Sequence, residues 1–163
     1  MKLTSKERVF LANQFKILEA LYPDEAYIYE RHRTALECGY TLQYGWITEW
    51  FSEELSEAEC QEVWDILEMY RSLKFAYNRL TDKNEITEEE IRFQGFDENE
   101  EARLMGYADY IIRDLGRYNE LSGIDLNAHR PCLERYRKML AEWNRSADKY
   151  NLEKDDILRI ISV

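Results

Sequence analysis

Four side chains with useful chemistry share one face of an expected helix in the second half of the chain. Arg103, Tyr107, Tyr110 and Asp114 are spaced at i, i+4, i+7 and i+11, which places them on the same side of a helix. Arginine offers a planar fork of donors to a carboxylate, and tyrosine offers a ring face and a hydroxyl. The pattern is typical of a polar wall that binds a small ligand.

A glycine lies in the middle of this helix, where it costs about 1 kcal/mol relative to alanine. Gly106 therefore indicates that a ligand or another backbone comes close. Two alternatives stay open: a pocket wall, or close helix packing at Gly106 with a buried polar network. We favour the network, and we expect Arg103 to form a charged pair inside the fold with Glu68 or Asp97.

Other polar residues extend this set. Glu68 and Glu37 are candidate paired carboxylates for acid/base work, although solvated or arginine-paired glutamates are the commoner outcome. Gly116, Arg117 and Tyr118 indicate either a loop that closes over the same region or a helix end followed by a turn. The candidate ligand-binding residues are Glu68, Phe96, Asp97, Arg103, Tyr107, Arg117 and Tyr118.

We expect no metal, no cofactor and no catalytic nucleophile. A zinc site needs three or four ligands, and the only histidines are His32 and His129. Three cysteines at wide spacing form no disulfide framework. Cys132 is the one thiol to check, because Arg130 and a helix start lie beside it. The chain has neither a Gly-x-Ser-x-Gly motif nor a glycine-rich phosphate loop after a strand.

The net charge limits the kinds of partner that we expect for this protein. The 163 residues include 22 basic and 33 acidic side chains, which gives a net charge of −11. A field of this sign repels phosphate backbones and anionic membranes, so we expect neither nucleic acid nor a membrane as a partner. The sequence shows no signal peptide and no run of about 20 apolar residues, so we expect a cytoplasmic protein.

Capping and breaking residues divide the chain into helices. We expect them over about residues 4–21, 24–39, 40–51, 56–80, 97–115, 131–150 and from 153 to the end. The helix over residues 56–80 carries two adjoining apolar stripes, which is typical of a helix covered on more than one side. The predicted fold class is all-α, with residues 1–163 forming a single compact multi-helix domain around that central helix.

Several short segments, read together, resemble the bacterial YfbU family. They are Asn13-Gln14, Glu37-Cys38-Gly39-Tyr40, Leu42-Gln43, Asp65-Ile66-Leu67-Glu68-Met69-Tyr70, Phe93-Gln94-Gly95-Phe96-Asp97, Glu101-Ala102-Arg103, Gly106-Tyr107, Gly116-Arg117-Tyr118, and Asn127-Ala128 with Pro131, Glu134 and Tyr136. The resemblance spans almost the whole chain in one order. It implies an all-helical bacterial protein and assigns no activity. Some members join such a domain to a helix-turn-helix module, which suggests a ligand-sensing role, although the net charge here disfavours DNA.

The expected function is that of a non-catalytic ligand-binding, regulatory or interaction module that acts as a homo-oligomer and takes a small-molecule ligand. The alternative is a small enzyme that uses carboxylate, arginine and tyrosine groups in a helical pocket. Trp46 and Trp50 are the first candidates for the self-association surface, because their segment has few charges. The other interpretation of these two rings is that they cap the core of the monomer.

Overall fold

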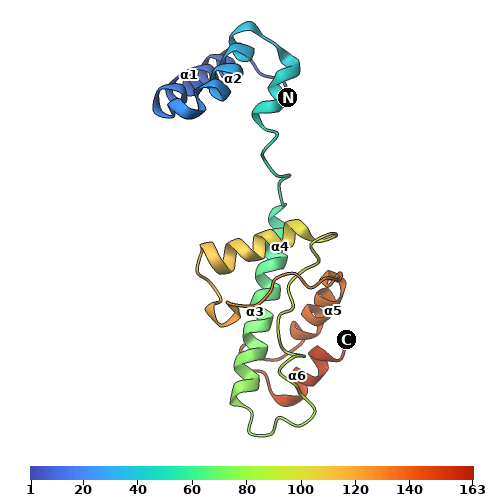
Figure 1. Cartoon of the computed structure of the whole chain (residues 1–163). Helices are drawn as coiled ribbons and strands as arrows, with labels where there is room; N and C mark the ends of the chain where they lie inside the picture. The colour runs from blue at the N-terminus through green and yellow to red at the C-terminus, as the bar shows by residue number, and fades with distance from the viewer. The chain divides into compact units, whose positions relative to one another are not determined.

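The structure, a computed structural model, describes all 163 residues and confirms the all-α class. Its elements are helices, and the only extended pairing is an isolated parallel bridge between Phe96 and Asn127. The chain divides into two compact units, Met1–Glu54 and Leu55–Val163 (Figure 1). The single domain over residues 1–163 stays a prediction.

The N-terminal unit is a helical hairpin followed by a 3₁₀ helix. Its elements are α1 (Ser5–Leu21), the short η1 (Pro23–Glu25), α2 (Ala26–Cys38) and η2 (Thr41–Ile47). A capping box of Thr4 and Glu7 starts α1, as its sequence predicts. The two long helices pack along each other around a small core of Ala12, Leu36 and Tyr44.

One arginine fastens this hairpin. The guanidinium of Arg8 on α1 donates to the Leu36 carbonyl at 2.8 and 2.5 Å and to the Glu37 carbonyl at 3.0 Å. These carbonyls belong to the last turn of α2, where helix carbonyls lack partners and a cation is favoured. Gly39 follows with a φ of 76°, a left-handed conformation that glycine favours, so the expected end of this helix at residue 39 is confirmed.

The C-terminal unit is built around α3 (Glu57–Arg79), the helix predicted to be central. Val63 and Met69, one from each predicted stripe, are completely buried, and α4, α5 and α6 all pack against α3. Figure 1 shows α3 running lengthwise through this unit with the later elements arranged beside it. The prediction of a central helix is therefore confirmed.

The remaining elements close the core of this unit. They are α4 (Ala102–Asp109), a turn of π-helix η3 (Tyr110–Asp114), η4 (Asn119–Leu121), α5 (Leu133–Trp143) and α6 (Lys154–Ile161). Four aromatic rings meet at the centre, those of Tyr70, Phe93, Phe96 and Tyr136, with centroids 5.4–5.7 Å apart. This spacing is typical of tilted and edge-to-face packing.

Several local predictions are wrong. The helix expected over residues 40–51 is a 3₁₀ helix that ends at Ile47. The helix expected from residue 24, where an aspartate favours a helix start, begins at Ala26, and Asp24 does not cap it because Pro23 starts a 3₁₀ turn that contains Asp24. The expected helix over residues 97–115 begins only at Ala102 and changes to π geometry at Tyr110. The apolar stripe expected to reach residue 150 stops with α5 at Trp143. In each case the chain departs from the regular α-helical turn that the periodicity alone would allow, by 3₁₀ geometry at Pro23 and up to Ile47, a wider π turn at Tyr110 and an early end at Trp143.

No helix of this structure combines the length and the apolar content that a membrane crossing requires.

Candidate functional site

A short segment, residues 118–122, is tied onto the middle of α3 by three polar contacts. The Tyr118 hydroxyl donates to Glu68 at 2.9 Å. Arg71 forms an ion pair and a hydrogen bond with the Glu120 carboxylate, and the Lys74 ammonium donates to the Glu120 carbonyl. One face of α3, presenting residues 68, 71 and 74 at i, i+3 and i+6, therefore holds this segment.

Tyr118 is the most constrained residue of the segment. Its φ is 52°, a left-handed backbone conformation that residues other than glycine rarely adopt, and the residue is only 4% exposed. The centroid of its ring lies 5.7 Å from that of the Trp64 ring. The Arg71 guanidinium lies over the Tyr118 ring, 4.1 Å from its centroid, in a cation–π contact. Strained residues of this kind cluster at binding sites.

The charges around Tyr118 are paired with one another. Burial raises the pKa of the Tyr118 hydroxyl, and its hydrogen bond to Glu68 raises that pKa further, so the phenol stays a neutral donor. Burial is the largest single influence on the Glu120 carboxyl and acts to raise its pKa, but its hydrogen bonds and the charges of Arg71 and Lys74 together outweigh burial, so the pKa lies below the ordinary value. Arg71 also lies 3.6 Å from Glu68. The result is a closed network.

Beside this network lies a hollow of about 510 Å³, which we call the aromatic hollow. It is lined by Gln61, Trp64, Asp65, Glu68, Tyr118 and Tyr150. The lining contains three aromatic rings and two carboxylates, and it contains no lysine or arginine. Asp65 accepts a hydrogen bond from Gln61 at 2.8 Å and takes part in no ion pair.

Tyr107 contacts Trp64, one of the residues that line this hollow. Its hydroxyl accepts a hydrogen bond from the Trp64 indole at 2.9 Å, and its ring stacks on Tyr110 with centroids 6.3 Å apart. Three residues of the predicted site, Glu68, Tyr107 and Tyr118, are thus brought together through Trp64, which the sequence did not single out.

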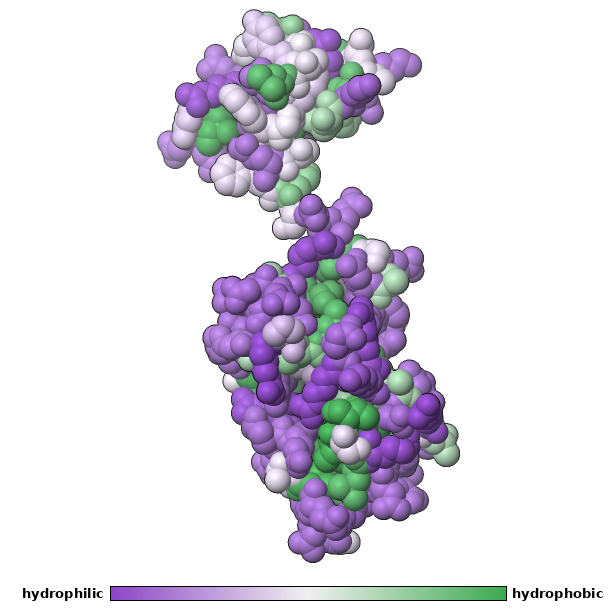
Figure 2. Space-filling view, turned by 90° about the vertical axis from the view of Figure 1, so that its right-hand side faces the viewer, coloured by the Kyte–Doolittle hydropathy of each residue, from purple (hydrophilic) through white to green (hydrophobic).

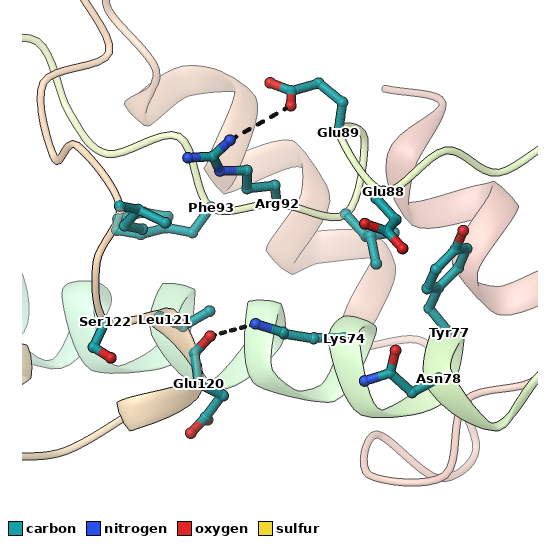
Figure 3. Close-up of a pocket in the computed structure, with 12 residues that line it drawn as sticks. Lys74, Tyr77, Asn78, Glu88, Glu89, Arg92, Phe93, Glu120, Leu121 and Ser122 are labelled. Atoms are coloured by element: carbon teal, nitrogen blue, oxygen red, sulfur yellow. Dashed lines mark hydrogen bonds and ion pairs between the residues drawn. The ribbon is translucent and has the colours of Figure 1, made fainter.

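A second hollow, of about 390 Å³, lies at the other end of the tied segment (Figure 3). Its buried lining is apolar and includes Phe93 and Leu121, and its rim carries both signs of charge. Figure 3 shows Lys74 reaching from α3 to the Glu120 carbonyl and Arg92 facing Glu89, an ion pair of 3.8 Å. None of the predicted site residues lines this hollow.

Two predicted site residues lie in the structural framework. Phe96 is fully buried in the aromatic core, and its backbone pairs with Leu126 and Ala128 at 2.9 Å. Asp97 is 4% exposed, and its side chain accepts the backbone N–H groups of Asn99 and Glu100 at 2.7 and 2.9 Å. Both residues fix the chain that leads into α4.

The expectations for Arg103 and Gly106 are wrong. Arg103 lies on the surface, with 43% of its side chain exposed, and forms an ion pair of 3.8 Å with Glu59. A Cβ placed on Gly106 would meet no atom within 4 Å, so no neighbouring backbone comes close there. Arg117, at the end of the π turn, is exposed as well.

The close approach that Gly106 was expected to mark occurs at Gly95. Its φ is 86°, and a Cβ there would lie 2.0 Å from the Leu126 carbonyl oxygen. Glycine is required because the backbone of residues 95–96 pairs directly with residues 126–128. Nothing local in the sequence identifies the partner strand segment, which lies about 30 residues further along the chain.

Sequence reasoning also missed the role of Glu101. This buried carboxylate accepts the N–H groups of Cys132 at 2.9 Å, Leu133 at 2.8 Å and Asp97 at 3.0 Å. It serves as the N-terminal cap of α5, whose own cap residue, Cys132, supplies no side-chain hydrogen bond. The run of acidic residues before α4 was the only signal in the sequence, and it did not show which of these carboxylates is buried.

The side chains that could bind a metal ion or act as a thiol nucleophile are not assembled into a site. No cluster of three or more histidine, cysteine, aspartate or glutamate side chains is placed to hold a metal ion. Cys132 is 4% exposed, and its thiol donates to the Arg130 carbonyl at 3.3 Å. The absence of a metal and of a nucleophile in the working protein stays a prediction.

The sequence of the chain matches the YfbU domain over residues 1–163, its full length. The match covers α3 and the tied segment 118–122 together with the N-terminal hairpin.

Proposed function

The chain belongs to the YfbU family, and we propose that it is a non-catalytic bacterial cytoplasmic module that binds a small organic cation and works as a homo-oligomer. The cation occupies the aromatic hollow over α3. Its chemical class is a primary, secondary or quaternary amine of a few carbon atoms.

One observation carries the choice of a cation: aromatic rings and carboxylates line the hollow without a basic side chain. Cations are attracted to the faces of tryptophan and tyrosine rings, which are here supplied by Trp64 and Tyr150, since Arg71 already lies over the Tyr118 ring. Asp65 offers a carboxylate with no cation of its own, so an ammonium group would gain an ion pair there. The net charge of −11 adds a long-range field of the same sign.

The strain at Tyr118 supports a binding role for this hollow. Turning a tyrosine into the left-handed region costs of order 1 kcal/mol, and the three contacts of the tied segment maintain it. The gain is a ring held between Trp64 and Arg71 with its hydroxyl on Glu68. Such a fixed wall lowers the entropic cost of binding a small ligand.

The closed network supports a non-catalytic role. A general acid or base needs an available carboxyl group with a shifted pKa, and Glu68 is already occupied by Tyr118 and Arg71. The two buried carboxylates of this unit, Asp97 and Glu101, accept backbone N–H groups and act as caps. The buried Oδ1 of Asp109 accepts no hydrogen bond, but it lies 2.9 Å from the Arg113 guanidinium in an ion pair.

The self-association part of the proposal is supported by exposed aromatic rings. Trp46 is 49% exposed and Trp50 is 82% exposed, so neither ring caps a core within the N-terminal unit. Aromatic residues with few charges around them are the composition that the centre of an interface prefers.

Calorimetric titration with 1,5-diaminopentane and with tetramethylammonium tests the ligand proposal on the full chain. We expect saturable binding at constant ionic strength, and a loss of at least tenfold in affinity in Asp65→Asn. The matched control is Asp155→Asn, which removes the same charge from an exposed position on α6 and should bind like the wild type. Equal weakening in both variants, or no saturable heat, would refute a specific site.

A further inference from the structure

The hollow in Figure 3, which we call the mixed hollow, shares no lining residue with the aromatic hollow. It lies within the C-terminal unit, and three stretches of chain form its walls: the second half of α3, residues 88–93 and residues 120–124. Its volume of about 390 Å³ lies within the range of about 300–1,000 Å³ that ligand pockets occupy. The mixed hollow is therefore large enough for a small organic molecule.

The apolar part of this lining is already formed without a ligand. Tyr77, Ile91 and Leu121 are buried members of the core of the C-terminal unit, so their packing fixes their positions. Ile124 packs against the same core and is half-buried. A hydrocarbon group of a few carbon atoms would lose contact with water here without any rearrangement of the walls, which lowers the cost of binding.

Some charges of the lining neutralise one another. The Glu120 carboxylate forms an ion pair with Arg71, and Glu89 lies 3.8 Å from the guanidinium of Arg92. Figure 2 shows hydrophilic side chains over most of the visible face of the C-terminal unit, which is the lower body in that view. Charged groups beside a hollow are thus common on this surface, and paired ones do not indicate a ligand.

Two other charges of the lining form no ion pair, and their signs are opposite. The Lys74 ammonium carries three N–H donors and gives one to a neutral acceptor, the Glu120 carbonyl. Glu88 takes part in no hydrogen bond and no ion pair. Figure 3 shows the two on different walls of the hollow, with Lys74 on α3 and Glu88 on the segment that leads to Arg92.

We propose that the mixed hollow binds a free α-amino acid with an apolar side chain, of the size of leucine or phenylalanine. The ligand carboxylate accepts the remaining N–H groups of Lys74, and the ligand ammonium donates to Glu88. The hydrocarbon side chain lies against Leu121 and Ile124. A plain amine or a plain carboxylic acid would use only one of the two unpaired charges, whereas a zwitterion uses both.

This site goes beyond the proposed function, because it takes a different ligand in a different hollow. Binding of an organic cation beside Asp65 and binding of an amino acid beside Glu88 are independent claims, and each can fail without the other.

Calorimetric titration of the full chain with L-leucine and with 4-methylpentanoate tests the proposal. The second compound has the hydrocarbon chain and carboxylate of leucine and lacks its ammonium group. We expect saturable binding of L-leucine below about 10 mM, and an affinity for 4-methylpentanoate that is weaker by at least about tenfold.

Glu88→Gln should weaken L-leucine binding at least about tenfold and leave 4-methylpentanoate unchanged, because it removes only the partner of the ammonium group. Glu100→Gln is the matched control, since it removes the same charge from an exposed glutamate that lines neither hollow. Lys74→Gln should weaken both compounds. Its amide still offers an N–H group to the Glu120 carbonyl, so the tied segment keeps a contact with α3. Circular dichroism of each variant checks that its helices are intact.

The contrary results are equally definite. The absence of saturable heat with both L-leucine and L-phenylalanine overturns the site. Equal affinity for L-leucine and 4-methylpentanoate, or equal weakening in Glu88→Gln and Glu100→Gln, overturns the α-amino acid as its ligand. Asp65→Asn should leave L-leucine binding unchanged, and a loss there as large as in Glu88→Gln would overturn a site separate from the aromatic hollow.

Discussion

Removing the buried carboxylate of Glu101 should destabilise the C-terminal unit more than any other single truncation of a charged side chain. Its two oxygens accept N–H groups from Cys132, Leu133 and Asp97 at 2.8–3.1 Å. Cys132 and Asp97 are each only 4% exposed, so water replaces the carboxylate poorly there. An unsatisfied buried donor costs about 1–3 kcal/mol. Two such donors and the loss of a negative charge at the start of α5 predict about 3–5 kcal/mol for Glu101→Ala.

Urea denaturation of the full chain, followed by tryptophan fluorescence, measures this loss. Trp143 lies on α5 and is 4% exposed, so its emission reports on the unit concerned. Glu101→Gln keeps one acceptor oxygen and should lose about half as much free energy of unfolding. Glu100→Ala is the matched control, because this neighbouring glutamate is exposed and should change stability by less than about 0.5 kcal/mol.

A loss below about 1 kcal/mol in Glu101→Ala would refute the reasoning. It would mean that water or a backbone shift satisfies the N–H groups of Cys132 and Leu133, and that the cap on α5 is not needed. An equal loss in Glu101→Ala and Glu100→Ala would show that the measured effect is that of charge in general.

Three further outcomes are expected. Gly106→Ala should raise the midpoint of thermal unfolding, with a gain of about 0.5–1 kcal/mol, because a Cβ meets nothing there and alanine favours the helix; a loss would mean that something unseen does approach Gly106. Gly95→Ala should leave little folded protein by circular dichroism, since its Cβ would lie 2.0 Å from the Leu126 carbonyl oxygen; a normal melting curve would contradict the pairing at residues 95–96. Stability should fall as the pH drops from about 5 to 3, because hydrogen bonds from the backbone and hydroxyl of Thr4 and Ser56 lower the pKa of Glu7 and Glu59 in the folded state. This contribution is present above the pKa of the unfolded chain and is lost as the pH falls through the folded value, so Glu59→Gln should show a weaker decline across that range.

The surface position of Arg103 illustrates why part of the predicted site was wrong. A glycine and two tyrosines beside an arginine suggested a buried pair, but helical spacing gives only a relative direction around the axis. Packing of Leu104 and Ala108 against the core decides which direction faces inward, and it turns Arg103 toward Glu59 and solvent. The residue types were interpreted correctly, but the sequence of a single helix does not show which of its faces points to the core.

Glu68, Tyr107 and Tyr118 show the opposite outcome. Each was selected for its chemistry, and the fold brings all three together around Trp64. Their positions along the chain are 50 residues or fewer apart, and no local rule links them. The side of α3 on which the tied segment lies, and the left-handed turn that places Tyr118 there, exist only because the segment packs onto that helix.

What the sequence determined by itself is the set of helices and the identity of the central one. The helix start at Thr4, the acidic first turn after Ser56, the stop at Gly39 and the paired stripes of α3 are local or periodic features, which depend on neighbours within a few residues. Tertiary structure alone decided the contacts across long separations: Gly95 against Leu126, Glu101 at the start of α5, and the hollow beside Tyr118. The physical reason is that hydrogen bonds and burial between distant segments depend on how helices pack, and a helical repeat specifies a face without naming the partner that covers it.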